Sequence, residues 1–447
     1  MALTDKLSAI GDAIRAVNGT TNTYTLGEMP DAILAFAESG EGDVALLTLR
    51  GDYSHAFRST HWNDFIATNQ SNIATADTTN GSYAFYETPI TVAPTVNLPG
   101  GTTFSDLGYM FAETPITQIP EIIYAKTPNS KSGGITAPRM FYNCTNLTTV
   151  PNISLGGAYR EQSVMGMFEG CTSLETAGNL LFGLDNDRYN CKPVDFSYLY
   201  SDCHQLQSVG YIDNMYPSDM SYMYKNCYIL RKAPAWFADY VELNNAEGLF
   251  YNCHSLRSLP SKSSLESLYT TKSTLNLGHL ARAGFYGCYA LNSITIGVSD
   301  NYNPYLYNSF YQTFDNCNRL ESLTLTGSYP GWSNQTLDLS VNVGWAPSAD
   351  NILNYNSGIT ADKEVTNSET YAALKNDPDW FTCDVNYSRY NHDSAVQTIN
   401  SLPYCSDKNT IKFKGTAGAL TDGGAINTLT ASEIAKATAN NWTVALV

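Results

Sequence analysis

This chain of 447 residues contains ten cysteines, and cysteine is the residue type with the widest range of possible chemistry. A cysteine can form a disulfide, bind a metal as thiolate or act as a nucleophile. Seven of the ten recur in one pattern: an aromatic residue, the cysteine three residues later, and a leucine three residues after that. The chain has no Cys-x-x-Cys pair, the spacing typical of zinc sites. We therefore expect seven free thiols that pack inward as small apolar side chains; a ladder of disulfides or metals is the alternative, and a Cys383–Cys405 bridge stays open.

Histidines and catalytic motifs give weaker signals. Of six histidines, His204 and His254 directly follow a cysteine of the pattern, and we expect both to face solvent. The chain has no Gly-x-Ser-x-Gly nucleophile elbow and no His-Glu-x-x-His zinc helix. We therefore predict no enzymatic activity, no cofactor and no metal. A pair of carboxylates that cleaves glycans stays open, because the separation that matters there is spatial.

Tyrosine is abundant in this chain, with 31 copies that form dense clusters. Its ring is rigid and its hydroxyl polar, so it is a common contact residue at interfaces and also stacks on sugars. Many of these tyrosines can equally pack within the fold. As candidates for contact with a receptor or partner, we select Tyr302, Tyr305, Tyr307, Tyr216 and Tyr222.

Charge and hydropathy exclude several classes of partner. The net charge is −17, although only 15% of the residues are charged. Such a surface repels phosphate, so we expect no nucleic-acid binding. The first 17 residues lack the apolar core of a secretory signal, and the sequence has no apolar run long enough to span a membrane. We expect a protein that is made and folded in a cytosol, without insertion into a membrane.

The cysteine pattern is also an internal repeat. Its copies lie 24 to 35 residues apart, and two degenerate copies around Phe85 and Phe111 precede them. About nine units of about 26 residues predict a solenoid over 83–345, because one unit cannot bury its own apolar face. Asn, Asp or Gly precedes each cysteine, which predicts a short helical turn that stops there and is followed by a strand. The expected core positions include Phe141, Cys144, Leu147, Phe168, Cys171, Leu174, Cys203, Cys227, Cys253, Cys288 and Cys317.

The repeat, written Phe-Tyr-Asn-Cys-x-x-Leu-x-x-[Val/Leu]-Pro, is similar to the leucine-rich repeat of BspA-type bacterial surface proteins. That resemblance implies a curved solenoid with a parallel sheet on one face and a role in adhesion or protein binding. The fold class that we predict is an α/β leucine-rich-repeat solenoid, with a strand face, short helical turns, a small N-terminal helical segment and an α+β C-terminal cap.

The N-terminal residues predict two short helices over 1–38, followed by a linker and entry strands over 39–82. Apolar residues in the first helix step by three and four residues, a spacing typical of helix association. The segments LTDKLSAIGDAIRAVNGTT and YTLGEMPDAILAF resemble the N-termini of phage tail, baseplate and fibre proteins. That resemblance implies attachment to a virion. Candidate attachment residues are Leu3, Leu7, Ile10, Ile14, Tyr24 and Met29.

The C-terminal region, 346–447, predicts a helix over 394–402 and a strand over 410–414. Thr430 and Glu433 have the spacing of a capping box, which opens a helix that ends before a strand at Trp442. The segment LTASEIAKATANNWTV is similar to the end of leucine-rich-repeat tail proteins of phages. We expect this region to cap the last coil of the solenoid.

Together these features predict a non-enzymatic structural protein of a phage virion, assembled in the host cytoplasm. The first hypothesis is a tail or fibre adhesin that binds a host surface polysaccharide or protein. The alternatives are a head fibre, capsid decoration or baseplate protein, and a bacterial cell-surface adhesin. The expected partners are other virion proteins at the N-terminus, the host surface, and further copies in a homo-oligomer, with a trimer as one possible state.

Overall fold

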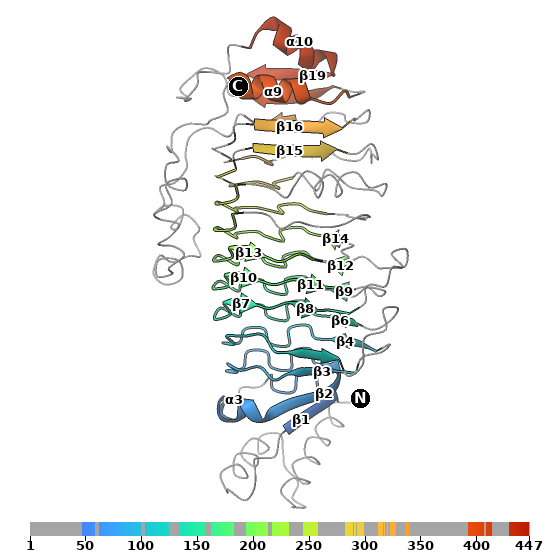
Figure 1. Cartoon of the computed structure of the whole chain (residues 1–447), viewed down its shortest axis with the longest axis vertical. Helices are drawn as coiled ribbons and strands as arrows, with labels where there is room; N and C mark the ends of the chain where they lie inside the picture. The colour runs from blue at the N-terminus through green and yellow to red at the C-terminus, as the bar shows by residue number, and fades with distance from the viewer. Residues whose placement is uncertain are drawn as a thin grey trace, which may run out of the picture.

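The structure is a computed structural model of the whole chain and describes part of it. The described residues form one long stack of coils with the C-terminal helices at one end (Figure 1). They are residues 47–58, 62–99, 103–124, 134–156, 162–182, 194–212, 217–231, 245–257, 282–288, 290–291, 293–298, 312–315, 317, 320, 322–327, 336–339, 392–405, 408–413 and 429–446.

Short strands stack in three columns, and every pairing between these strands is parallel. The first column joins β1 (Leu47–Asp52), β2 (Ile73–Asn80), β4 (Phe104–Asp106) and β6 (Gly134–Thr136), and continues in β9 (Gln162–Ser163), β12 (Val194–Asp195) and β14 (Pro217–Asp219). The second column contains β7 (Thr149–Val150), β10 (Thr176–Ala177) and β13 (Ser208–Val209). The third column contains β3 (Val96–Leu98), β5 (Ile122–Tyr124), β8 (Ile153–Ser154) and β11 (Leu180–Leu181). Nearer the C-terminus, β15 (Ser293–Val298) pairs with β16 (Ser322–Gly327). The predicted repeat solenoid is therefore confirmed.

The bend between the first and second columns is not a helix, so the predicted short helical turns are wrong. The amide of Met140 donates to the carbonyl of Ala137, whereas the next amide, that of Phe141, donates to Met167 in the following coil at 2.9 Å. Alternate amides thus bond within a coil and between coils, which an α-helix cannot do. The expected left-handed residue before the cysteine is present, with φ of 55° at Asn143, and a second one lies four residues earlier at Arg139.

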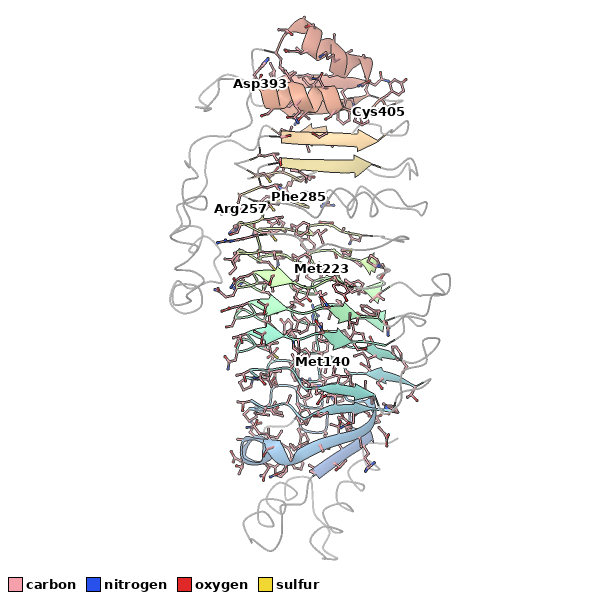
Figure 2. The ribbon with its side chains drawn as sticks, viewed as in Figure 1. Met140, Met223, Arg257, Phe285, Asp393 and Cys405 are labelled. Atoms are coloured by element: carbon pink, nitrogen blue, oxygen red, sulfur yellow. The ribbon has the colours of Figure 1, made fainter. Side chains whose placement is uncertain are left out.

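A continuous column of aromatic rings fills the interior of the stack. Successive rings lie 5.2–5.9 Å apart, and all are buried. Met140, Met223 and Phe285 lie among the side chains that fill this interior (Figure 2). We call these rings the inner aromatic column: Phe57, Phe85, Phe111, Phe141, Phe168, Tyr200, Tyr224, Phe250, Phe285 and Phe314.

The stack begins before the expected solenoid boundary at residue 83. Residues 47–58 form a coil whose amides at Tyr53, His55 and Phe57 donate to the coil that follows. The helix α3 (Asn63–Asn69) and the 3-10 turn η2 (Gln70–Asn72) connect this coil to β2. The predicted N-terminal helices over 1–38 lie outside the described residues.

The C-terminal elements agree closely with the sequence prediction. They are β17 (Thr336–Asp338), α9 (His392–Ser401), β18 (Asn409–Phe413), α10 (Ala431–Ala439) and β19 (Trp442–Leu446). The capping box is confirmed: the Glu433 amide donates to the Thr430 hydroxyl, and the Thr430 amide donates to Glu433 Oε2. β17, β18 and β19 form a parallel sheet, and α9 packs against β16.

Candidate functional site

The seven cysteines of the repeat are buried free thiols with a structural role. Each Sγ donates to the backbone carbonyl of the inner-column residue in the preceding coil, at 3.0–3.2 Å; Cys227, for example, donates to Tyr200. Burial raises the pKa of these thiols, so they stay protonated and unreactive. Cys405 is also free and buried, and Cys383 lies outside the described residues. All eleven core positions named from the sequence are buried.

The prediction that both histidines face solvent is wrong for His254. His254 is buried, and His204 is half-buried. Their rings stack on either side of the Tyr228 ring, with centroids 4.9 Å and 4.7 Å apart. Burial lowers the pKa of His254 to about 3, and the proximity of His204 adds to the effect. The residue after the cysteine thus forms a second aromatic stack, which becomes visible only when the coils are aligned.

Half-exposed tyrosines line the outer side of the bend between the first and second strand columns. We call them the outer tyrosine column: Tyr83, Tyr86, Tyr109, Tyr142, Tyr198, Tyr222, Tyr251 and Tyr286. Three pairs stack almost face to face, at 4.7 Å for Tyr83–Tyr109, 5.5 Å for Tyr198–Tyr222 and 4.6 Å for Tyr251–Tyr286. Because the buried rings of the inner column follow two residues after Tyr83, Tyr109, Tyr198 and Tyr222, these four side chains point outward.

A turn before each of these four tyrosines fixes its direction. The carboxylate of Asp195 accepts from the Ser197 amide at 2.9 Å, just before Tyr198. Asp219, Asn80 and Asp106 make the same bond before the other three tyrosines. Each tyrosine then adopts a left-handed φ of 53–57°. The sequence contains a signal for this turn, namely Asp or Asn three residues before Tyr. The sequence analysis missed this signal.

Other residues replace tyrosine in several coils at the left-handed position held by Tyr83, Tyr109, Tyr198 and Tyr222: Arg139, Gly166, Gly248, Ala283 and Gln312. Arg139 occupies a tyrosine position, and its guanidinium contacts Glu169 at 2.8 Å and the Tyr109 hydroxyl at 3.1 Å. It also lies over the Tyr142 ring, 5.4 Å from the centroid. The Tyr222 ring covers Gly248, where a Cβ atom would clash with it. The Arg139 side chain and the Tyr222 ring thus cover two of the positions that lack tyrosine.

The polar groups of this surface are hydrogen-bonded pairs of tyrosine and glutamate. The Tyr222 hydroxyl donates to Glu247 at 2.8 Å, and the Tyr86 hydroxyl donates to Glu113 at 3.3 Å. Desolvation, followed by the neighbouring glutamate, raises the pKa of Tyr222 and of Tyr86 to about 12. These phenols are therefore protonated at neutral pH, and each pair presents a hydroxyl and a carboxylate side by side.

Of the five tyrosines selected from the sequence, Tyr222 lies in the outer tyrosine column. Tyr216, Tyr302, Tyr305 and Tyr307 lie outside the described residues, as do the attachment candidates Leu3, Leu7, Ile10, Ile14, Tyr24 and Met29. The structure brings Tyr222 together with Tyr198, Tyr251 and Glu247.

Comparison of the chain with protein-family models and with curated proteins finds no match. Within the described ranges, no group of three or more His, Cys, Asp or Glu side chains has an arrangement that could hold a metal ion. In the same part of the chain, no helix is long and apolar enough to cross a membrane.

Proposed function

We propose that this chain is a non-enzymatic structural protein of a phage virion. Its N-terminal segment attaches it to the particle, and its solenoid acts as a tail or fibre adhesin for a polysaccharide or protein of the host surface. The observation that carries the proposal is the stack itself, in which hydrogen bonds from backbone amides and from cysteine thiols join each coil to the next. Such a stack holds an ordered outer surface along its whole length.

The resemblance of both ends of the chain to phage tail proteins supports the virion setting. The repeat supports a relationship to BspA-type leucine-rich repeats, in a variant that has turns instead of helices on its bend. Multiple copies on one particle convert weak individual sites into firm attachment, which suits a surface made of many similar coils.

We also propose that the C-terminal region caps the solenoid through α9. The Thr398 hydroxyl donates to the Leu323 carbonyl at 2.8 Å, and the Leu325 amide donates to the Ser401 hydroxyl at 3.1 Å. Leu323 and Leu325 are alternate residues of β16, so these backbone groups point to the same edge of the strand. The two hydroxyls replace the hydrogen bonds that a further strand would make, and so protect the edge from another chain.

Mass spectrometry of purified particles tests the virion proposal. The chain should appear in fixed stoichiometry with the other structural proteins, and its absence from intact particles would contradict the proposal. Antibody labelling in electron micrographs separates the placements, because label at the tail tip supports an adhesin whereas label on the capsid supports decoration.

The double substitution T398V/S401A tests the cap. Both side chains keep their approximate volume but lose a hydroxyl, which leaves the β16 edge without two partners. Size-exclusion chromatography should then show end-to-end association that the unmodified chain lacks. Gln397→Ala, which removes a hydrogen bond to the Thr324 side chain of β16 but none to the backbone edge of this strand, is the control.

A further inference from the structure

The outer tyrosine column carries a more specific inference, which rests on the proposed function. We propose that this column is a binding site for an extended, uncharged polysaccharide that lies along the stack, with one sugar ring at each coil. The argument depends on three properties of the column: which atoms it exposes, how they are spaced and what charge surrounds them.

The column exposes ring edges and hydroxyls instead of ring faces. Centroid distances of 4.6–5.5 Å leave no room for a further ring between stacked partners. A sugar therefore cannot stack between these tyrosines, and its contacts must be hydrogen bonds. In the Tyr86–Glu113 and Tyr222–Glu247 pairs the phenol hydrogen is donated to the carboxylate, so each pair offers adjacent phenol and carboxylate oxygens as acceptors for the vicinal hydroxyls of a sugar.

The spacing fits a linear polymer. Each coil from that of Phe85 to that of Phe285, except the coil of Phe168, carries at least one tyrosine of the column, either two residues before or one residue after the inner ring. Successive coils are separated by the distance between neighbouring strands in a sheet. A 1,4-linked polysaccharide in an extended conformation advances by a similar length for each sugar. Successive sugars can therefore meet polar groups of successive coils, and the binding free energy should increase with the length of the glycan.

The chemistry of the surface favours a glycan over a protein. Within the described part of the chain, the large exposed apolar side chains are Val92, Tyr211, Tyr404 and Leu446, none of which belongs to the column. The tyrosines of the column are only half-exposed, so they offer less apolar area than the centre of a typical protein interface. Two arginines at this surface, Arg139 and Arg282, are paired with Glu169 and Glu247, and the net charge of −17 of the chain disfavours an anionic polymer.

Isothermal titration of the full chain with uncharged 1,4-linked hexasaccharides, cellohexaose and hexa-N-acetylchitohexaose, tests this inference. At least one hexamer should bind, its dimer should bind at least tenfold more weakly, and oligogalacturonate, which is anionic, should not bind. Removal of one hydroxyl by Tyr222→Phe or Tyr86→Phe should weaken binding about fivefold while the ring stack remains. Tyr211→Phe, an exposed tyrosine outside the column, should leave binding unchanged.

Three results would overturn the inference: no binding of either hexamer, equal binding of dimer and hexamer, or unchanged binding by both column variants. Self-association that Tyr222→Phe abolishes would instead assign the column to a second copy of the chain. The virion proposal is judged separately, because a chain that is present in particles but binds neither hexamer disproves only the glycan site.

Discussion

The inner aromatic column and the outer tyrosine column arise from the same repeat but differ in almost every physical respect. The inner rings are all buried and follow one another without interruption from Phe57 to Phe314. The outer rings are half-exposed, and Arg139, Gly166, Gly248, Ala283 and Gln312 interrupt them. Packing fixes the inner positions, since each ring touches the rings above and below. The outer positions tolerate variation, and this freedom is what a binding surface requires.

Phe168 and Tyr198 give the largest expected contrast between the two columns. Phe168→Ala removes a buried ring that stacks at 5.5 Å and 5.6 Å on its neighbours, and should cost about 3–5 kcal/mol of unfolding free energy. Tyr198→Ala removes a half-exposed ring and should cost about 1 kcal/mol. Urea unfolding followed by circular dichroism measures both values, and equal losses would abolish the distinction.

His254 tests whether the stack of the His204, Tyr228 and His254 rings is buried beside the inner aromatic column. Its pKa is about 3 in the folded chain and about 6.5 when unfolded, so the unfolded state binds the proton more readily. The contribution of this group to the unfolding free energy is fully present above pH 6.5. It decreases as the pH falls below 6.5, and the loss reaches about 2 kcal/mol at pH 5. His254→Tyr should remove this loss in urea titrations at pH 7 and pH 5. His55→Gln, at an exposed histidine, should keep it.

Gly248 tests how closely the outer column is ordered. Gly248→Ala places a Cβ against the Tyr222 ring at a residue with φ of 62°, and should cost about 1–2 kcal/mol. Gly51→Ala is the matched control, because that glycine has φ of 64° and open space around its Cα. The cost at Gly51 should reflect the backbone alone, about 1 kcal/mol. A larger loss at Gly51 would show that the Tyr222 ring does not hold its place.

Substitution of Cys227 has the smallest expected effect and tests the hydrogen bond that its thiol donates to the backbone. Cys227→Ser keeps a donor to the Tyr200 carbonyl, whereas Cys227→Val keeps volume and loses the donor. Serine should therefore be the more stable variant by about 0.5–1 kcal/mol in thermal unfolding. If valine is more stable, the cysteines act only as small apolar side chains.

The sequence predicted the parts of the fold that depend on local chemistry and periodicity. The left-handed residue before six of the repeat cysteines, the inward aromatic residue and the capping box at Thr430 all follow from residue types at fixed spacing. The bend was mistaken for a helix because its second left-handed position holds Arg139, Tyr198 or Tyr222, which carry no such preference.

Features that depend on the alignment of coils could not be predicted from single segments. His254 is buried because Tyr228 lies in the adjacent coil, and each thiol donates to a residue 27 to 38 positions earlier. The coil at 47–58 escaped notice because it lacks the cysteine and keeps only the ring of Phe57. For the candidate site, the sequence selected Tyr222 but could not group it with the tyrosines that stack along the bend.

Competition for host attachment tests the central claim most directly, namely that the outer tyrosine column of a virion protein binds the host surface. Host cells are mixed with phage particles and an excess of the purified chain, and adsorption is counted as plaques from unadsorbed phage. The account predicts that the unmodified chain blocks adsorption and that the double variant Y86F/Y222F, with its stack intact, blocks it much less. Equal competition by both chains, or none by either, would contradict it.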